Sequence, residues 1–208
     1  MPIKEFIERE YKGLISESDY LRVIEKHLPE VGRQINYYFD TPDCELYKQG
    51  ITLRVRDKNA GAVATAEREL TVKTSGVRTG NTSLRGEHTQ KLKSDRPING
   101  SMGFEELLFV CGAEVCTSIQ NALIAIKINE LKCFGSLVTE RSKIGVGGNL
   151  FIELDKSEYL GCTDYEVEFE YNGERDLYGL QNFIKQNGIT VWPSIGKYSR
   201  FIRKLKGM

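Results

Sequence analysis

The 208-residue sequence is poor in the residues that carry most nucleophilic and metal-binding chemistry. Its only histidines are His27 and His88, so a Ser-His-Asp or Cys-His arrangement has little support. Its 5 cysteines are odd in number and contain no CxxC pair, which argues against a zinc site or a disulfide framework and favours reduced thiols. The glycine-rich segment 145–148 is not followed by Lys-Ser/Thr, so it predicts a turn and not a phosphate-binding P-loop.

Charge and hydropathy exclude further classes. The chain carries 29 basic and 29 acidic residues, and this balance gives no support to a general nucleic-acid or membrane-surface binder. No apolar run approaches membrane-spanning length, and the first residues lack the apolar core of a signal peptide. We therefore expect a cytoplasmic protein with no nucleic-acid or membrane partner, folded as one domain over residues 1–208 and present as a monomer or homodimer.

What the sequence does contain is rows of charge on predicted strands. Residues 7–12 alternate so that Glu8, Glu10 and Lys12 share one face of a strand, while apolar residues share the other. Taken alone, this pattern fits a half-buried strand with its charges in water. Similar rows recur on later strands, and this repetition needs an explanation.

Alternation of polar and apolar residues predicts about eight strands, at residues 7–12, 34–40, 51–56, 67–73, 84–92, 129–146, 149–155 and 164–171. The long segment 129–146 is predicted as one strand, or as two with a bend at Gly135. Segment 75–81 contains two glycines and is predicted to be a flexible connection. Helical patterns occupy residues 16–27, 104–110, 118–125 and 174–187, and a short basic helix ends near Lys206.

The charged side chains are sorted by strand. Acids cluster on the first and last strands, at Glu8, Glu10, Glu166, Glu168 and Glu170. Bases dominate the strands between them, at Arg54, Arg56, Lys73, Arg85 and Arg141. A surface that serves only solubility mixes the two signs locally. Alternation alone leaves open whether these rows face water or line an interior.

Sorted charges and apolar helices together favour the second arrangement. The helices need an apolar surface to lie on, and the apolar faces of the strands would provide it. We therefore predict a mainly β, α+β fold: a closed eight-stranded antiparallel β-barrel whose charged rows line a tunnel and whose helices pack on the outside.

A charged interior is stable only if its ions are compensated, because each unpaired buried ion costs several kcal/mol. Arginine forks suit phosphate oxygens, and carboxylates suit Mg²⁺ or Mn²⁺. A linear polyphosphate with a bound divalent cation meets both demands.

Several short motifs, in order along the chain, carry a family resemblance. They are Glu8-x-Glu10-x-Lys12, Tyr38-Phe39-Asp40-Thr41-Pro42, Leu53-Arg54-Val55-Arg56, Leu70-Thr71-Val72-Lys73, Arg85-x-Glu87, Leu154-Asp155, Glu166-Val167-Glu168-Phe169-Glu170 and Lys197-Tyr198-Ser199-Arg200. This ordered set resembles the CYTH superfamily, the triphosphate tunnel metalloenzymes, whose signature is ExExK. The resemblance covers nearly the whole chain.

The resemblance implies a tunnel that binds a triphosphate and usually hydrolyses it with Mg²⁺ or Mn²⁺. It assigns phosphate oxygens to Lys12, Arg54, Arg56, Lys73, Arg85, Arg141, Lys197 and Arg200. It assigns the metal to Glu8, Glu10, Glu168 and Glu170, with Glu87, Asp155 and Glu166 as further candidates. Since Glu166, Glu168 and Glu170 share a face, which two of them bind metal stays open. Glu8, Glu10, Lys12 and Lys73 are the expected catalytic residues.

Three functions fit this set. The first is a metal-dependent triphosphatase that acts on tripolyphosphate, thiamine triphosphate or a nucleoside triphosphate and releases orthophosphate. The second is an adenylate cyclase of the same superfamily; such cyclases tend to carry a His-Phe pair shortly before ExExK, and here Phe6 stands without that arrangement. The third is a non-catalytic polyphosphate- or nucleotide-binding module, although a pure binder needs bases more than metal-binding rows.

Overall fold

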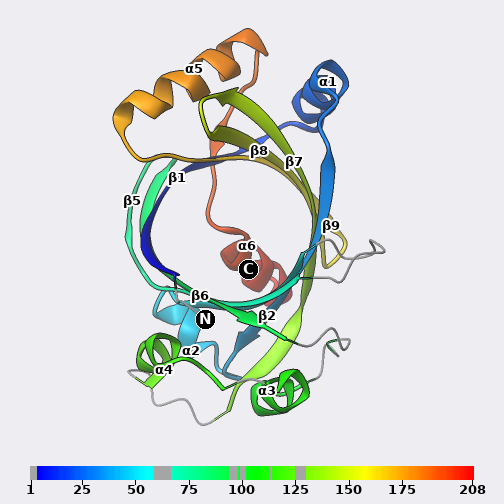
Figure 1. Cartoon of the computed structure of the whole chain (residues 1–208). Coiled ribbons are helices and arrows are strands. Elements are labelled where there is room, and N and C mark those ends of the chain that lie inside the picture. The colour runs from blue at the N-terminus through cyan, green and yellow to red at the C-terminus, as the bar shows by residue number, and fades with distance from the viewer. Residues whose placement is uncertain (1–3, 59–66, 94–97, 99–101, 113, 125–129) are drawn as a thin grey trace.

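A computed structural model describes residues 4–58, 67–93, 98, 102–112, 114–124 and 130–208, and its central feature is a closed ring of antiparallel strands. The ring contains β1 (Lys4–Ile15), β2 (Val31–Asp40), β3 (Thr52–Lys58), β4 (Glu67–Lys73), β6 (Thr82–Leu92), β7 (Lys132–Gly147), β8 (Leu150–Tyr159) and β9 (Cys162–Glu170). Their order is β1-β9-β8-β7-β2-β3-β4-β6, and pairing of β6 with β1 closes the barrel (Figure 1). The short strands β5 (Val77–Thr79) and β10 (Trp192–Pro193) extend β6 and β1.

β1 closes the ring because it pairs on both sides. Its first part lies against β6, from Lys4 opposite Thr89 onward, and its last part lies against β9, ending with Ile15 opposite Tyr165. Gly13 sits where β10 also meets β1. A Cβ atom at Gly13 would lie 2.4 Å from Cγ1 of Val191, so only glycine permits this close approach.

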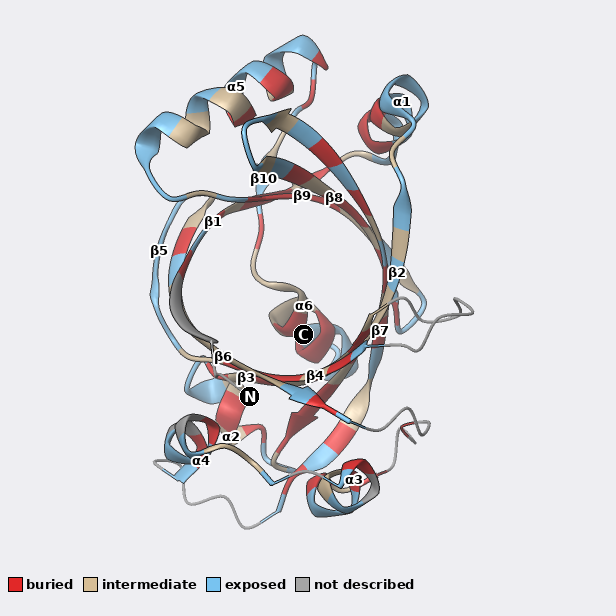
Figure 2. Cartoon of the chain, viewed as in Figure 1, coloured by how far each residue is buried: buried red, intermediate tan, exposed pale blue. Residues whose placement is uncertain are grey.

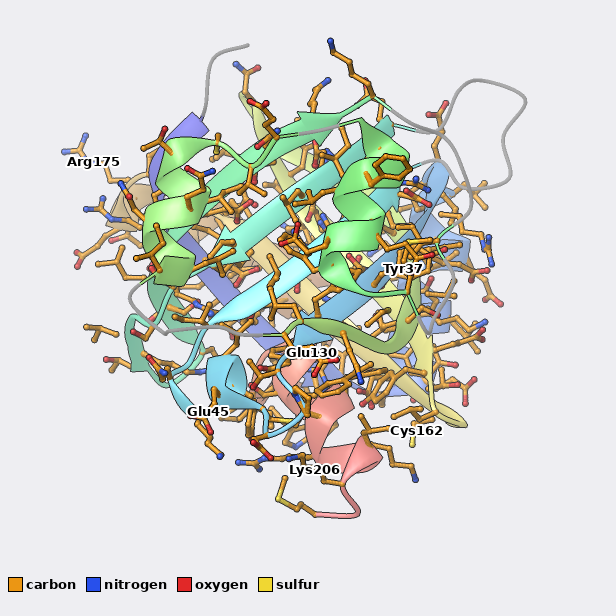
Figure 3. The ribbon with its side chains drawn as sticks, turned by 90° about the horizontal axis from the view of Figure 1, so that it is seen from below. Tyr37, Glu45, Glu130, Cys162, Arg175 and Lys206 are labelled. Atoms are coloured by element: carbon orange, nitrogen blue, oxygen red, sulfur yellow. The ribbon has the colours of Figure 1, made fainter. Side chains whose placement is uncertain are left out.

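Apolar rows of the strands face outward, under the helices. On one side, α3 (Phe104–Cys111) and α4 (Thr117–Ile124) cover β3 and β4, whose side chains Leu53, Val55, Leu70 and Val72 are fully buried (Figure 3). On the other side, α1 (Glu17–His27) and α5 (Leu177–Gln186) cover β8 and β9. Buried residues lie on the sides of α1 and α5 that face the ring (Figure 2). The predicted barrel with helices outside is confirmed.

One end of the barrel is occupied by α6 (Lys197–Leu205), seen through the ring in Figure 1. Phe201 and Ile202 pack there against Tyr38 of β2, Leu137 of β7 and Tyr159 of β8. Figure 3 shows Lys206, just after α6, at the same end as Glu45 of the short helix α2 (Glu45–Lys48). We refer to this end as the α6 end.

Local chemistry explains several boundaries. Ser16 caps α1, because its hydroxyl accepts a hydrogen bond from the Asp19 N–H at 3.0 Å. The predicted helix 174–187 instead begins as a 3-10 turn, η1 (Glu174–Asp176), where Asp176 accepts hydrogen bonds from the N–H groups of Asn172 and Gly173.

Two predictions about strands need correction or refinement. The connection 75–81 is not wholly flexible, because it contains β5, which pairs with β6 through Val77 opposite Leu84. Segment 129–146 forms one long strand from Lys132, with a register shift where Gly135 pairs with Tyr38; its first residue lies outside the described part. Several other strands extend beyond their predicted ends, since pairing with a neighbour continues past the alternating pattern.

Two absences predicted from the sequence can be examined in the described residues. The cysteines Cys44, Cys111, Cys116, Cys133 and Cys162 are all free. Within the described ranges, no helix combines the length and the apolar character needed to cross a membrane.

Candidate functional site

The charged rows of the strands line the bore of the barrel, as the sorting of charge by strand and the apolar helices predicted. Two cavities meet in this bore at Arg54. The cavity at the α6 end has a volume of about 90 Å³ and is lined by Lys12, Arg54, Lys73, Arg85 and Lys197, among others. The cavity at the opposite end is larger, about 790 Å³, and its lining includes Arg54, Arg56, Glu87, Arg141 and Glu170. The bore therefore brings together bases and acids from strands far apart in sequence.

A first cluster joins β1, β4 and β6. Lys73 donates to both oxygens of Glu8, at 2.7 and 2.8 Å, and its Nζ lies 2.8 Å from Oε2 of Glu87. Next to it, Lys12 forms an ion pair with Glu10. Glu8, Glu10 and Lys12 are all less than 9% exposed, so these charges are compensated mainly by one another.

The protonation of this first cluster follows from these contacts. Burial alone would raise the pKa of Glu87, but the charges of Lys73 and Arg54 outweigh it and lower that pKa to about 2. Burial likewise opposes the charge of Lys73, yet the carboxylates of Glu8 and Glu87 raise its pKa above the ordinary value. Lys73 is therefore cationic and Glu87 anionic across the physiological range.

A second cluster joins β7, β8 and β9 around Arg141. Its guanidinium donates to both oxygens of Asp155, at 2.8 and 2.6 Å, and also pairs with Glu168 and Glu153. Asp155 is fully buried. Burial would raise the pKa of Asp155, but Arg141 and Lys197 lower it. Arg141 is therefore surrounded by acids, and its guanidinium binds the Asp155 carboxylate through two hydrogen bonds, a geometry that suits this pair well.

Side chains of α6 complete the second cluster. Lys197 reaches Asp155 at 2.8 Å, Glu166 at 2.7 Å and Glu168 at 2.5 Å. Arg200 pairs with Glu166 at 3.1 Å, and also with Asp164 at 2.8 Å. Glu166 is fully buried and meets two cations of the same helix. These pairs tie α6 to the wall of the barrel.

A third group of cations is not paired with an acid in the part of the chain that the structure describes. Arg54, Arg56 and Arg85 form no ion pair with any carboxylate of the described residues. Arg56 donates from Nε to Oδ1 of Asn36 at 2.8 Å, and Arg85 donates to the carbonyl oxygens of Thr74 and Gly50. Nε of Arg54 is buried without a hydrogen-bond partner in the described part of the chain. Burial, together with the neighbouring Arg54 and Arg141, lowers the pKa of Arg56 to about 9. Such uncompensated charge favours an anionic ligand.

Four glutamates on adjacent strands, Glu8 and Glu10 of β1 and Glu168 and Glu170 of β9, form what we call the acidic row. Their carboxylates are a donor set that fits a hard divalent cation. Glu10 pairs in register with Glu170, and Lys12 with Glu168, so these carboxylates lie on adjacent strands. Burial and then the nearby Glu168 raise the pKa of Glu10, while burial and then Glu8 raise that of Glu170. A cation would relieve this repulsion, and carboxylate oxygens suit Mg²⁺ or Mn²⁺. In the described residues, however, no three or more His, Cys, Asp or Glu side chains converge into a ready metal site.

Every residue predicted for the site therefore belongs to one of the three groups or to the acidic row. Glu170 is the exposed member of the acidic row. Two further acids, Glu153 and Asp164, were not predicted, although each has the same strand parity as a predicted acid on its own strand. Asp40 was also missed. It is fully buried, accepts a hydrogen bond from the Tyr198 hydroxyl at 2.5 Å, and also accepts from the N–H groups of Leu46 and Tyr47. Only tertiary contact with α6 reveals this role.

Comparison with known proteins agrees with this geometry. The CYTH domain model matches residues 7–201. The "Putative triphosphatase YjbK" of Bacillus subtilis (strain 168) is 28% identical over 170 residues, which are 79% of this chain and 77% of that protein. The crystal structure of a "putative adenylate cyclase" from Bacillus halodurans has a TM-score of 0.73 and 30% identity, covering 95% of this chain and 98% of that one.

A second solved structure, HpAC1 from Hippeastrum, is described as a "putative adenylyl cyclase" with a dominant triphosphatase activity. It has a TM-score of 0.72 at 22% identity, covering 94% of this chain and 95% of that one, and at this identity it shows the fold alone. The family match spans nearly the whole sequence and agrees with the barrel and its charged bore. The chain therefore belongs to the CYTH domain family.

Proposed function

We propose that this protein is a metal-dependent triphosphatase, which hydrolyses an inorganic or organic triphosphate and releases orthophosphate. The observation that carries the proposal is the separation of charge across one bore: Arg54, Arg56 and Arg85 have no acidic partner among the described residues, while the acidic row lies on β1 and β9. The naming of the Bacillus subtilis relative as a putative triphosphatase supports the same reaction.

The residues of the bore would act mainly by position and charge. Arg54, Arg56 and Arg85 would bind phosphate oxygens, and Lys12 and Lys73 at the α6 end would neutralise further oxygens of the same chain. Phosphoryl transfer needs little covalent participation by the protein, so fixed cations that hold the phosphates in line supply most of the stabilisation of the transition state.

A divalent cation, Mg²⁺ or Mn²⁺, would be held by Glu8, Glu10, Glu168 and Glu170. When bound, it would neutralise phosphate oxygens and lower the pKa of the attacking water. Asp155 and Glu166 suit this role less, because both are fully buried and both are already paired with cations of the second cluster. Glu168 also pairs with Arg141 and Lys197, but its side chain is 11% exposed and it lies opposite Lys12 of β1, next to the Glu10–Glu170 pair. We therefore choose Glu168 and Glu170 over Glu166 as the β9 ligands.

The test is phosphate release from a panel of triphosphates: tripolyphosphate, thiamine triphosphate and ATP, with Mg²⁺ and Mn²⁺ tested separately. Release of orthophosphate that requires a divalent cation is the expected result. No release from any substrate with either metal, from folded protein, would contradict the proposal and would favour the non-catalytic binding module.

A cyclase is the second candidate, because the Bacillus halodurans protein, at 30% identity, is named as a putative adenylate cyclase. The same ATP reaction distinguishes the two. A cyclase yields cyclic AMP and diphosphate, whereas a triphosphatase yields orthophosphate, and both sets of products are separable by chromatography.

A further inference from the structure

The two lysines of the first cluster are bound to acids that the proposed function assigns to metal. Lys73 donates to both oxygens of Glu8, at 2.7 and 2.8 Å, and Lys12 forms an ion pair with Glu10. The side chains of Glu8 and Glu10 are each 6% exposed, so water contributes little to their solvation. The lysine ammonium groups thus occupy the oxygens that a divalent cation would need.

A lysine and a divalent cation cannot share these oxygens at low cost. An ammonium group in contact with a carboxylate would stand within a few ångströms of any cation on the same carboxylate, and buried like charges repel strongly at that range. In agreement with this, no three His, Cys, Asp or Glu side chains of the described residues form a ready metal site. Metal binding therefore requires that Lys12 and Lys73 first leave these carboxylates and pair with another anion.

The bore already offers a place for that anion. Arg54, Arg56 and Arg85 form no ion pair with acids of the described chain, and the buried Nε of Arg54 has no hydrogen-bond partner there. Arg54 and Arg85 line the same cavity as Lys12 and Lys73. A phosphate chain bound by these arginines therefore lies within reach of both lysines.

We propose that the two ligands bind in order and assist each other: the triphosphate binds first to Arg54, Arg56 and Arg85, and Lys12 and Lys73 then move from Glu10 and Glu8 to its oxygens. This exchange frees the two carboxylates for the divalent cation. The inference rests on the proposed function for the identity of the ligands, but it concerns binding and not turnover. Linkage makes the effect reciprocal, and couplings of this kind are typically about 5- to 150-fold.

Removing either ammonium group tests the exchange. Lys73→Met and Lys12→Met keep an unbranched side chain and remove the ammonium group with its charge and hydrogen-bond donors. With Mn²⁺ alone, followed by its electron paramagnetic resonance signal, each variant should bind the metal about tenfold or more tightly than the natural protein. With the imido analogue of tripolyphosphate in metal-free buffer, followed by calorimetry, each variant should bind more weakly.

Lys48→Met is the matched control, since it removes a lysine from an exposed ion pair with Glu45 on α2. It should change neither affinity. Circular dichroism of all the variants checks that they are folded.

Opposite changes in the two affinities are the signature of the exchange. Mn²⁺ affinity that is unchanged or lower in both lysine variants would overturn the proposal, even if the protein hydrolyses triphosphates. Conversely, opposite changes in a protein without phosphate release would uphold the exchange and refute the proposed hydrolysis. The two ideas therefore fail separately.

Discussion

The carboxylates inside the barrel fall into two kinds, distinguished by the strength of their compensation. Asp155 and Glu166 are fully buried and each meets two cations of the second cluster. Glu10 and Glu170 instead lie beside other carboxylates, and burial followed by this repulsion raises the pKa of both. Fully compensated acids hold a structure together, whereas poorly compensated acids can accept a further cation. Substitution of a fully compensated acid should therefore lower stability, whereas substitution of a poorly compensated acid should lower turnover.

Glu8 and Glu10 are both proposed metal ligands, so Glu8→Gln or Glu10→Gln should abolish turnover and preserve the fold. Glutamine keeps the size of the side chain but removes the charge proposed to hold the metal, so metal-dependent phosphate release should fall by roughly 100-fold or more. The melting curve should stay cooperative. Glu25→Gln, at an exposed position on α1, is the control. Undiminished phosphate release in the Glu8 and Glu10 variants would refute their role.

For the first kind, Glu166→Gln should lower the free energy of unfolding by about 3 kcal/mol, because it leaves Lys197 and Arg200 short of a buried counter-charge. Urea titration measures this loss. Glu158→Gln, which disrupts an exposed ion pair with Lys156, should cost less than about 1 kcal/mol. Equal losses in the two variants would show that Glu166 is not a structural anchor.

At the scale of the element, α6 depends on a contact with the turn after β2. Asp40 accepts from the N–H groups of Thr41, Leu46 and Tyr47, which fixes the turn, and it also accepts from the hydroxyl of Tyr198. Burial and this hydrogen bond raise the pKa of Tyr198 above its ordinary value. The contact holds the first turn of α6, from which Lys197 enters the bore.

Tyr198→Phe removes only this hydroxyl. We expect a loss of about 1–2 kcal/mol in the free energy of unfolding, since a buried acceptor loses one of its donors. We also expect a several-fold lower kcat/KM, because Lys197 becomes less well positioned. Tyr178→Phe, at an exposed position of α5, should change neither quantity. A variant with unchanged stability and kcat/KM would show that the Asp40 contact does not position α6.

The strands of the barrel show which parts of the site could be predicted from the sequence and which could not. Strand alternation has a period of two, so it correctly grouped Glu8 with Glu10 and Arg54 with Arg56 on one face. It could not tell which acid meets which base, because strand pairing is non-local: β2 lies beside β7, about a hundred residues away in sequence. For the same reason, Asp164 was missed as the partner of Arg200 on α6. Glu153 is different, because it lies in the hairpin of β7 and β8 with Arg141; alternation placed it on the same face as Asp155 but did not distinguish it as a partner.

At the scale of the whole molecule, a net charge of +0 conceals strong internal segregation. The barrel keeps basic and acidic groups in one low-dielectric bore, so its stability should depend on pH through groups whose pKa differs between the folded and unfolded states. Glu87 provides the clearest case. Burial would raise its pKa, but Lys73 and Arg54 lower it from 4.5 to about 2.

The sign of this dependence follows directly. A carboxylate whose pKa is lowered by folding contributes stability that is fully present above its unfolded pKa, near 4.5, and lost as the pH falls through its folded pKa of about 2. The shift corresponds to about 3 kcal/mol. Urea titrations of the natural protein and of Glu87→Gln should therefore differ by a constant amount between about pH 7 and pH 5. Their difference should then shrink toward about pH 2, because protonation of Glu87 makes the natural protein resemble the variant. A difference that does not change below pH 5 would mean that Lys73 and Arg54 do not stabilise the ionised form of Glu87.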